Sequence, residues 1–129
     1  MDFIDLLEIA RQNINEMQFS PRAKAGWVSS ALLAENGKIY TGINLDVTCE
    51  LGCCAEYSAI VGMVNDGESV IQKIVTVKWD GEVRPPCGKC RELISILNTE
   101  NVNTEILVTE NTVKRISELL PYDWKYIDN

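Results

Sequence analysis

The chain has 129 residues, of which 46% are hydrophobic and 24% charged, proportions typical of one globular domain, which we expect to span residues 1–129. The net charge is −7, and no cluster of Lys or Arg forms the basic patch that long nucleic acid requires, so a small ligand is the expected partner. No apolar run approaches the roughly 20 residues of a membrane span, and the N-terminus lacks a signal-peptide pattern, so we expect a cytoplasmic protein without a membrane partner.

The first third of the chain predicts one helix followed by a hairpin. Residues 2–17 carry apolar side chains at helical spacing, and Ser20-Pro21 breaks that pattern. The near-continuous apolar run 27–34 predicts a buried strand. Glu35-Asn36-Gly37 is a hairpin turn signal, and residues 38–43 then form the returning strand.

The remainder of the chain alternates helices and strands. Helical spacing predicts helices over 54–64, 88–98 and 116–120, whereas alternating or β-branched residues predict strands over 71–79 and 104–109. The resulting order, α-β-β-α-β-α-β-α, favours a sheet covered by helices on both faces.

The five cysteines do not suggest a disulfide framework. Their number is odd, Cys53 and Cys54 are adjacent, and clustered cysteines in a reducing compartment more often bind metal or perform redox chemistry. The chain contains no histidine, which excludes histidine triads and imidazole ligands. General acid–base chemistry must therefore use carboxylates, Lys, Tyr or Cys.

Three cysteines stand where loops enter predicted helices, a position that favours thiolate over thiol. Cys87 and Cys90 form a C-x-x-C pair that can chelate one tetrahedral zinc ion, and Cys54 can add a third thiolate from a second helix. Three protein ligands leave one position open, as in catalytic zinc sites. Glu56, two residues after Cys54, can place a carboxylate beside that position.

Three thiolates and one zinc ion carry a formal charge of −1, so a positive group should offset it. Helix dipoles contribute to this balance. Among the side chains, Arg91, directly after Cys90, is the first candidate, and Lys89 is the second.

The motif Cys54-Ala55-Glu56 followed by Pro86-Cys87-x-x-Cys90 resembles the signature of zinc-dependent cytidine deaminases in their three-cysteine form. Residues 37–44 are similar to the hairpin of that family, and Leu119-Leu120-Pro121 is similar to its C-terminal motif. The resemblance extends from about residue 27 to residue 124. The short length and closing aromatics resemble the blasticidin S deaminase branch.

This resemblance implies a three-layer α/β/α sandwich with a mixed sheet and a short homotetrameric enzyme. It implies one zinc ion per chain, bound by Cys54, Cys87 and Cys90. The implied reaction is hydrolytic removal of the exocyclic amine of a cytosine nucleoside (cytidine or deoxycytidine) or of a related nucleoside such as blasticidin S, with release of ammonia.

The resemblance also assigns roles to single residues. Glu56 would move protons between water, the ring nitrogen and the leaving ammonia, and the backbone of Ala55 would hold the ring carbonyl oxygen. Asn44 and Asp46 would approach the sugar, and Trp124 would be the C-terminal aromatic residue that closes over the ligand.

Four positions differ from the family pattern. Asp46 replaces the usual Glu, Tyr57 stands where Arg is common, Gly26 occupies an aromatic position, and Pro85 replaces Ser. Because an Arg at position 57 would help to balance the thiolates, its replacement by Tyr gives Arg91 a larger share of that task.

Other interpretations of the same residues remain open. Cys87 and Cys90 could serve a thiol oxidoreductase, or a fourth thiolate from Cys53 or Cys49 could complete a non-catalytic structural zinc domain. As a second interpretation, Cys49 and Cys53 are small buried hydrophobes.

The remaining site candidates also have structural alternatives. Glu56 could cap a helix at the surface, Asn44 and Asp46 could satisfy a turn, and Trp124 could anchor the core. Arg91 could simply pair with Glu92 or another acid.

Overall fold

The computed structural model describes residues 1–127 of the chain. Its helices are α1 (Phe3–Gln12), α2 (Ala55–Asn65), α3 (Gly88–Leu97), α4 (Ile116–Leu119) and α5 (Trp124–Ile127), with 3-10 turns η1 (Thr48–Glu50) and η2 (Thr99–Asn103). Its strands are β1 (Met17–Ser20), β2 (Ala23–Ala34), β3 (Ile39–Val47), β4 (Ile71–Lys78), β5 (Glu105–Thr109) and β6 (Thr112–Arg115).

Within residues 1–127 the six strands form one sheet in the order β1-β2-β4-β5-β6, with β3 also paired to β2. The pair β4–β5 is parallel, and the other pairs are antiparallel. The parallel pair is connected through α3, because parallel strands need a crossover that returns the chain to the same end of the sheet. This mixed topology confirms the predicted α/β class.

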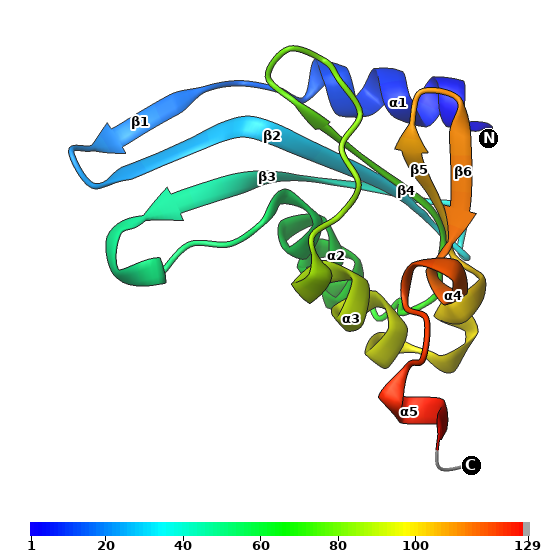
Figure 1. Cartoon of the computed structure of the whole chain (residues 1–129). Coiled ribbons are helices and arrows are strands. Elements are labelled where there is room, and N and C mark those ends of the chain that lie inside the picture. The colour runs from blue at the N-terminus through cyan, green and yellow to red at the C-terminus, as the bar shows by residue number, and fades with distance from the viewer. Residues whose placement is uncertain (128–129) are drawn as a thin grey trace.

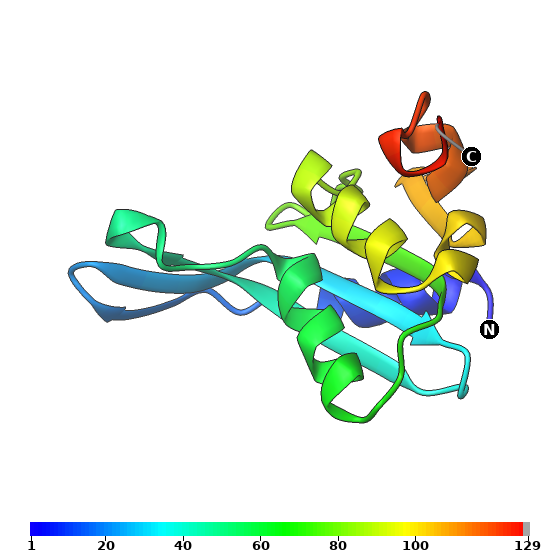
Figure 2. The same cartoon turned by 90° about the horizontal axis from the view of Figure 1, so that it is seen from below.

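Helices cover the two faces of the sheet, with α1 on one side and α2 and α3 on the other (Figures 1 and 2). The two sides have separate cores. Under α1 the buried residues are Leu6, Ala10, Ala31, Val75, Val77 and Leu107. Facing α2 and α3 they are Leu32, Ala34, Ala59, Ile60, Met63, Ile71, Ile74, Ile94, Ile106 and Ile116. Burial of each large apolar side chain contributes about 1.5–3 kcal/mol, so both layers are firmly attached, as the three-layer expectation requires.

Strand β2 supplies residues to both cores because its side chains alternate between the two faces. Ala31 faces α1, whereas Leu32 faces α2 and α3. Residues 27–34 are mostly apolar because both faces of β2 are buried.

Gly42 of β3 permits α2 to lie directly on the sheet. A Cβ atom there would come within 2.4 Å of the Ala55 carbonyl oxygen and the Ala59 backbone nitrogen. Any larger residue at position 42 would push the N-terminal turn of α2 away from the sheet. This close approach fixes the height of Glu56 above the strands.

The N-terminal helix was predicted to be longer than it is, because α1 ends at Gln12 rather than at Met17. The Asn15 backbone N–H donates to the Gly26 carbonyl oxygen at 2.9 Å, and Met17 then pairs with Ala25. Pairing with β2 thus outweighs the helical spacing of the apolar residues.

Three short elements lie outside the predicted order: β1, β6 and α5. Both strands are only four residues long and lie at the edges of the sheet. The joined ends of β1 and β2 and the end of β3 extend beyond the helices as an arm (Figure 1). In residues 1–127, no helix combines the length and apolar character needed to cross a membrane.

Candidate active site

Two helix N-termini carry the cysteines of the candidate site. Cys54 is the N-cap of α2 and Cys87 is the N-cap of α3, each with an extended backbone and without a side-chain capping hydrogen bond. Both sulfur atoms therefore remain available to a ligand. The unpaired N–H groups and partial positive charge of each helix start favour a negative thiolate there.

The four predicted metal-site and catalytic side chains come together. One ligand atom from each of Cys54, Glu56, Cys87 and Cys90 lies within 4.8 Å of all the others. The Sγ atoms of Cys54 and Cys87 are 3.7 Å apart. Two thiolates bound tetrahedrally at about 2.3 Å from zinc would be about 3.8 Å apart, so this spacing suits one shared ion.

The thiols of the cluster differ in how readily they ionise. Burial raises the pKa of Cys90, and the nearby negative charge of Glu56 raises it further. Burial also raises the pKa of Cys54. Burial opposes ionisation of Cys87 too, but hydrogen bonds from the Cys90 backbone N–H and neighbouring thiols outweigh it, so the pKa of Cys87 lies below its ordinary value. Of the three thiols, Cys87 alone therefore has a pKa below the ordinary value.

Glu56 is not a surface carboxylate. It is only 4% exposed, and its Oε1 accepts a hydrogen bond from the Thr76 hydroxyl at 3.1 Å. A buried carboxylate beside three thiols is costly unless a cation or a proton accompanies it. The surface-capping alternative for Glu56 is therefore excluded.

A pocket of about 290 Å³ opens onto the cluster. Its lining contains six of the residues expected from the family resemblance together with five others. The full set is Trp27, Val28, Asn44, Asp46, Cys53, Cys54, Ala55, Glu56, Arg84, Pro85 and Cys87. The pocket is large enough for a small molecule, and Glu56, Cys54 and Cys87 form part of its wall.

Asn44 lines this pocket and also holds its wall. Its Oδ1 atom accepts hydrogen bonds from the backbone N–H groups of Gly26, Trp27 and Val28 at 3.1, 3.0 and 3.0 Å. The register of β2 and β3 is interrupted between Ala25 and Ser29, and Asn44 satisfies the N–H groups freed there. Its Nδ2 group remains to donate to a ligand.

Asp46 and Ala55 lie where the resemblance expected them, in the lining of the pocket. The pocket residues that sequence reasoning did not select as site candidates are Trp27, Val28, Cys53, Arg84 and Pro85. The position of Arg84 immediately before Pro85-Pro86 was the available signal, because the segment leading into Cys87 must pass the site. Trp27, next to the atypical Gly26, was the other signal.

Cys49 and Cys53 do not belong to the cluster among the described residues. Cys49 is exposed and Cys53 is half-buried, so the interpretation of Cys49 as a small buried hydrophobe is wrong. Its backbone has φ of 63°, in a loop that keeps it away from a packed core. The group accompanying the three thiols is thus a carboxylate rather than a fourth thiol.

Arg91 is anchored to the turn that carries Cys87. Its Nε donates to the Pro86 carbonyl oxygen at 2.9 Å, and the predicted alternative, a pair with Glu92, is not among its contacts in residues 1–127. The Lys89 Nζ lies 5.3 Å from the centre of the Tyr57 ring. A cation on α3 thus lies against the residue that occupies the usual Arg position on α2.

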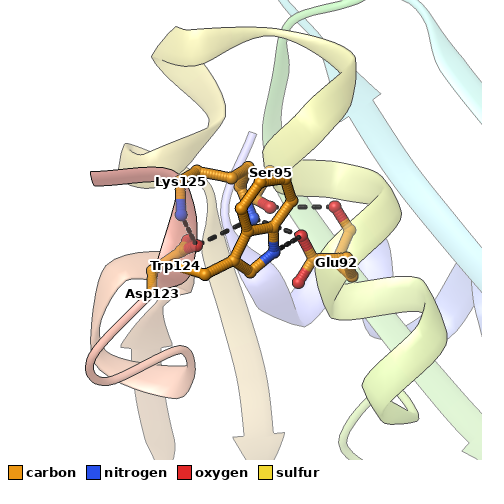
Figure 3. A network of polar contacts seen from close by, with 5 residues as sticks. All are labelled: Glu92, Ser95, Asp123, Trp124 and Lys125. Carbon is orange, nitrogen blue, oxygen red and sulfur yellow. Dashed lines mark hydrogen bonds and ion pairs between the residues drawn. The ribbon is translucent and has the colours of Figure 1, made fainter. Parts of the chain in front are cut away.

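Trp124 lies outside the pocket lining, in a polar network shown in Figure 3. It is 68% exposed, which excludes the core-anchor alternative, and its Nε1 donates to Glu92 Oε1 at 3.2 Å. Lys125 pairs with Glu92 and, at 2.9 Å, with Asp123. This network fastens α5 to α3, and a role for Trp124 in closing over a ligand stays a prediction.

Comparison with known proteins agrees with this geometry. Residues 5–106 match the family described as the cytidine and deoxycytidylate deaminase zinc-binding region. The chain is 31% identical over 93 residues to a cytidine deaminase of Sporosarcina psychrophila, covering 71% of this chain and 68% of the relative. It is 29% identical over 101 residues to a blasticidin-S deaminase of Bacillus cereus, covering 71% and 70%.

The fold is similar to solved structures as well. The crystal structure of cytidine deaminase from Mycobacterium tuberculosis superposes with a TM-score of 0.77 at 26% identity, covering 95% of this chain and 96% of that one. The structural similarity therefore extends over nearly the whole chain and is not confined to the motifs.

Proposed function

The chain belongs to the cytidine and deoxycytidylate deaminase family, and we propose that it removes the exocyclic amine of a cytosine nucleoside, or of a related nucleoside such as blasticidin S, with release of ammonia. The observation that carries this proposal is the cluster of Cys54, Cys87, Cys90 and Glu56, three of which line a pocket of about 290 Å³. Neither an oxidoreductase nor a structural zinc site requires the buried carboxylate and the pocket.

The donor set fits zinc. A site with three sulfur donors favours zinc over magnesium or calcium, because the latter two ions bind oxygen ligands. With Cys54, Cys87 and Cys90 as ligands, a tetrahedral ion keeps its fourth position open. When bound there, zinc would supply Lewis acidity that makes water acidic near neutral pH.

Glu56 is the proposed proton carrier. It takes a proton from the attacking water and delivers it to the ring nitrogen and to the leaving ammonia. Its burial keeps solvent water from competing for the proton. Its place one residue after the start of α2 supports this role, because the helix fixes Glu56 relative to Cys54.

Three polar groups of the pocket are proposed to orient the nucleoside. The Ala55 N–H lies in the first turn of α2, where backbone N–H groups lack intrahelical acceptors, and so can donate to the ring carbonyl oxygen. The Asn44 Nδ2 and the Asp46 carboxylate would contact the sugar. The carboxylate of Asp46 can accept hydroxyl protons, which suits a sugar better than a phosphate.

Arg91 and the two helix starts are proposed to balance the charge of the thiolates. The hydrogen bond from Arg91 to Pro86 keeps the guanidinium at the turn next to Cys87. Lys89 is the second contributor, and its contact with the ring of Tyr57 supports a position between α2 and α3.

A homotetramer in the cytoplasm is the proposed working form. Its support is the outer face of α2, where Tyr57, Val61 and Val64 are 37%, 49% and 45% exposed. Their spacing places them on one face of the helix. Solvent exposure of three such neighbours is unfavourable, and a second copy of the chain would cover them.

Ammonia release from zinc-loaded protein tests the proposed reaction. The panel consists of cytidine, deoxycytidine, blasticidin S and N4-substituted cytidines, and the product is detected independently by mass spectrometry. We expect turnover of at least one member with the amine replaced by a carbonyl. A fully folded protein with one zinc ion per chain and no turnover of any member would contradict the proposal.

A further inference from the structure

Three residues form a row across the sheet directly beneath the start of α2. Gly42 of β3 pairs with Ser30 of β2, and Ser30 pairs on its other side with Thr76 of β4. Residues at paired positions lie on the same face of a sheet. Gly42 is in contact with the first turns of α2, so Ser30 and Thr76 lie on the face that carries Glu56.

The two hydroxyls of this row continue to Glu56 as a chain of hydrogen-bonding contacts. Thr76 Oγ1 is 3.1 Å from Glu56 Oε1 and 3.2 Å from Ser30 Oγ. Ser30 Oγ in turn donates to the Val75 carbonyl oxygen at 3.1 Å. Each hydroxyl has one proton, so when Thr76 donates to Glu56, its contact with Ser30 is a hydrogen bond only if Ser30 donates to Thr76 in place of Val75. The contact that reaches the carboxylate directly is therefore the one from Thr76.

The side chains of Ser30, Thr76 and Glu56 are all buried. Ser30 is 0%, Thr76 2% and Glu56 4% exposed. A buried polar side chain costs free energy unless it has a hydrogen-bond partner, whereas an apolar side chain at the same position would not need one. A hydrogen bond to an ionised carboxylate in a buried site is also stronger than one between neutral groups. The Thr76 hydroxyl therefore acts on Glu56 with little competition from water.

The neighbouring residue Ser29 is a useful comparison for Ser30. Ser29 is also fully buried, but its Oγ has no hydrogen-bond partner in residues 1–127. Because side chains alternate along β2, Ser29 faces α1 and Ser30 faces Glu56. Of these two adjacent buried serines, Ser30 is therefore the one that lies on the side of the site.

We propose that Thr76, with Ser30 packed beside it, is a positioning residue that holds the Glu56 carboxylate in one orientation beside the three thiols. Thr76 does not line the pocket, so it acts through Glu56 and not on the substrate. This inference rests on the proposed proton transfer by Glu56. With Oε1 held by Thr76, Oε2 has no hydrogen-bond partner among the described residues and is the oxygen left for proton transfer.

Kinetics of three variants test the proposal. Thr76→Val keeps the β-branched shape and removes the hydroxyl, and we expect kcat to fall about 10- to 100-fold, the value of one hydrogen bond to a charged group. KM and zinc content should stay within about twofold, because Thr76 contacts neither the pocket nor the thiols. Thr76→Ser restores the hydroxyl and should recover most of kcat. Ser30→Ala should lower kcat less than Thr76→Val does.

Matched controls separate positioning from loss of a buried polar group. Thr104→Val removes a buried hydroxyl that donates to the Ile71 carbonyl oxygen at 2.7 Å, one residue before β5 and away from Glu56. Ser29→Ala removes the unpartnered hydroxyl next to Ser30. Both should leave kcat unchanged. Wild-type kcat in Thr76→Val, or equal impairment of Thr76→Ser and Thr76→Val, would overturn the proposal.

Crystal structures of the wild type and Thr76→Val provide a readout that does not depend on turnover. We expect one Glu56 conformer in the wild type, with Oε1 at hydrogen-bond distance from Thr76, and several conformers or raised displacement factors in the variant. One unchanged Glu56 conformer in Thr76→Val would overturn the proposal. If the wild type itself turned over no substrate, the proposed function would fail, while these structures would still decide whether Thr76 positions Glu56.

Discussion

At the scale of single residues, different side chains of the site would bind the metal and transfer the proton. Cys54, Cys87 and Cys90 supply soft sulfur donors, whereas Glu56 supplies the one carboxylate of the cluster. The raised pKa of the Cys54 and Cys90 thiols means that, without a cation, these two keep their protons at neutral pH. A bound cation would displace those protons. The net charge next to Glu56 therefore depends on whether a cation is bound to the three sulfur atoms.

Asn44 combines a structural and a binding role, and two substitutions can separate them. Asn44→Ala leaves three backbone N–H groups of β2 without their acceptor, so the free energy of unfolding should fall by about 1–3 kcal/mol. Asn44→Asp retains an oxygen acceptor and should stay near wild-type stability. It lacks the Nδ2 donor, so KM for the nucleoside should rise. Urea unfolding and steady-state kinetics measure the two effects, and equal stabilities of both variants would contradict the structural role.

At the scale of elements, the C-terminal helix is attached to the fold chiefly by polar contacts. Lys125 of α5 bridges Glu92 of α3 and Asp123 at the helix start, and Trp124 adds a bond to Glu92 (Figure 3). Trp124 and Tyr126 remain largely exposed. An element held in this way depends on pH and charge far more than the helices that cover the sheet.

The attachment of α5 should therefore be limited to a range of pH. Partial burial opposes the charge of Asp123, but hydrogen bonds from Lys125 outweigh it and lower the pKa of Asp123. The contribution of Asp123 to the attachment is therefore complete above the ordinary Asp value of about 4 and is lost as pH falls through the lowered pKa. Partial burial opposes the charge of Lys125 too, but its two carboxylate partners raise its pKa. That contribution is complete below the ordinary Lys value of about 10.4 and is lost as pH rises through the raised pKa.

Hydrogen–deuterium exchange of residues 121–127 measures this attachment. We expect protection across the neutral range and a loss of protection in acid, after correction for intrinsic exchange rates. Lys125→Met should show the unprotected state at neutral pH, whereas Lys114→Met, which removes an exposed pair with Glu118, should not. Equal protection in Lys125→Met and the wild type would show that the polar network does not hold α5.

The elements that carry the motifs could be predicted from the sequence, whereas several contacts between them could not. The starts of α2 and α3 follow from local signals around Cys54 and Cys87, and spacing within one helical turn brings Cys90 beside Cys87. The contact between Thr76 and Glu56 depends instead on the register of β2 against β4, which no local pattern specifies. The same holds for Asn44, whose three N–H partners are 16 to 18 residues earlier in the chain.

At the scale of the whole molecule, the exposed face of α2 bears on how copies of the chain assemble. Val61→Glu places a charge in the middle of that face, between Tyr57 and Val64, and should shift a tetramer toward smaller species. Ile4→Glu is the matched control, because Ile4 is 77% exposed on α1, across the sheet. Sedimentation velocity measures both variants. Unchanged assembly of Val61→Glu, or equal dissociation of both, would contradict an interface at α2.

The most direct test of the account compares zinc content and turnover in wild type and Glu56→Gln. The substitution keeps the size of the side chain and all three sulfur donors but removes the proton carrier. We predict close to one zinc ion per chain in both proteins and a fall in kcat of about 10²- to 10⁴-fold in the variant. Turnover near the wild-type rate in zinc-loaded Glu56→Gln would contradict the central claim, as would loss of activity only in proportion to loss of zinc.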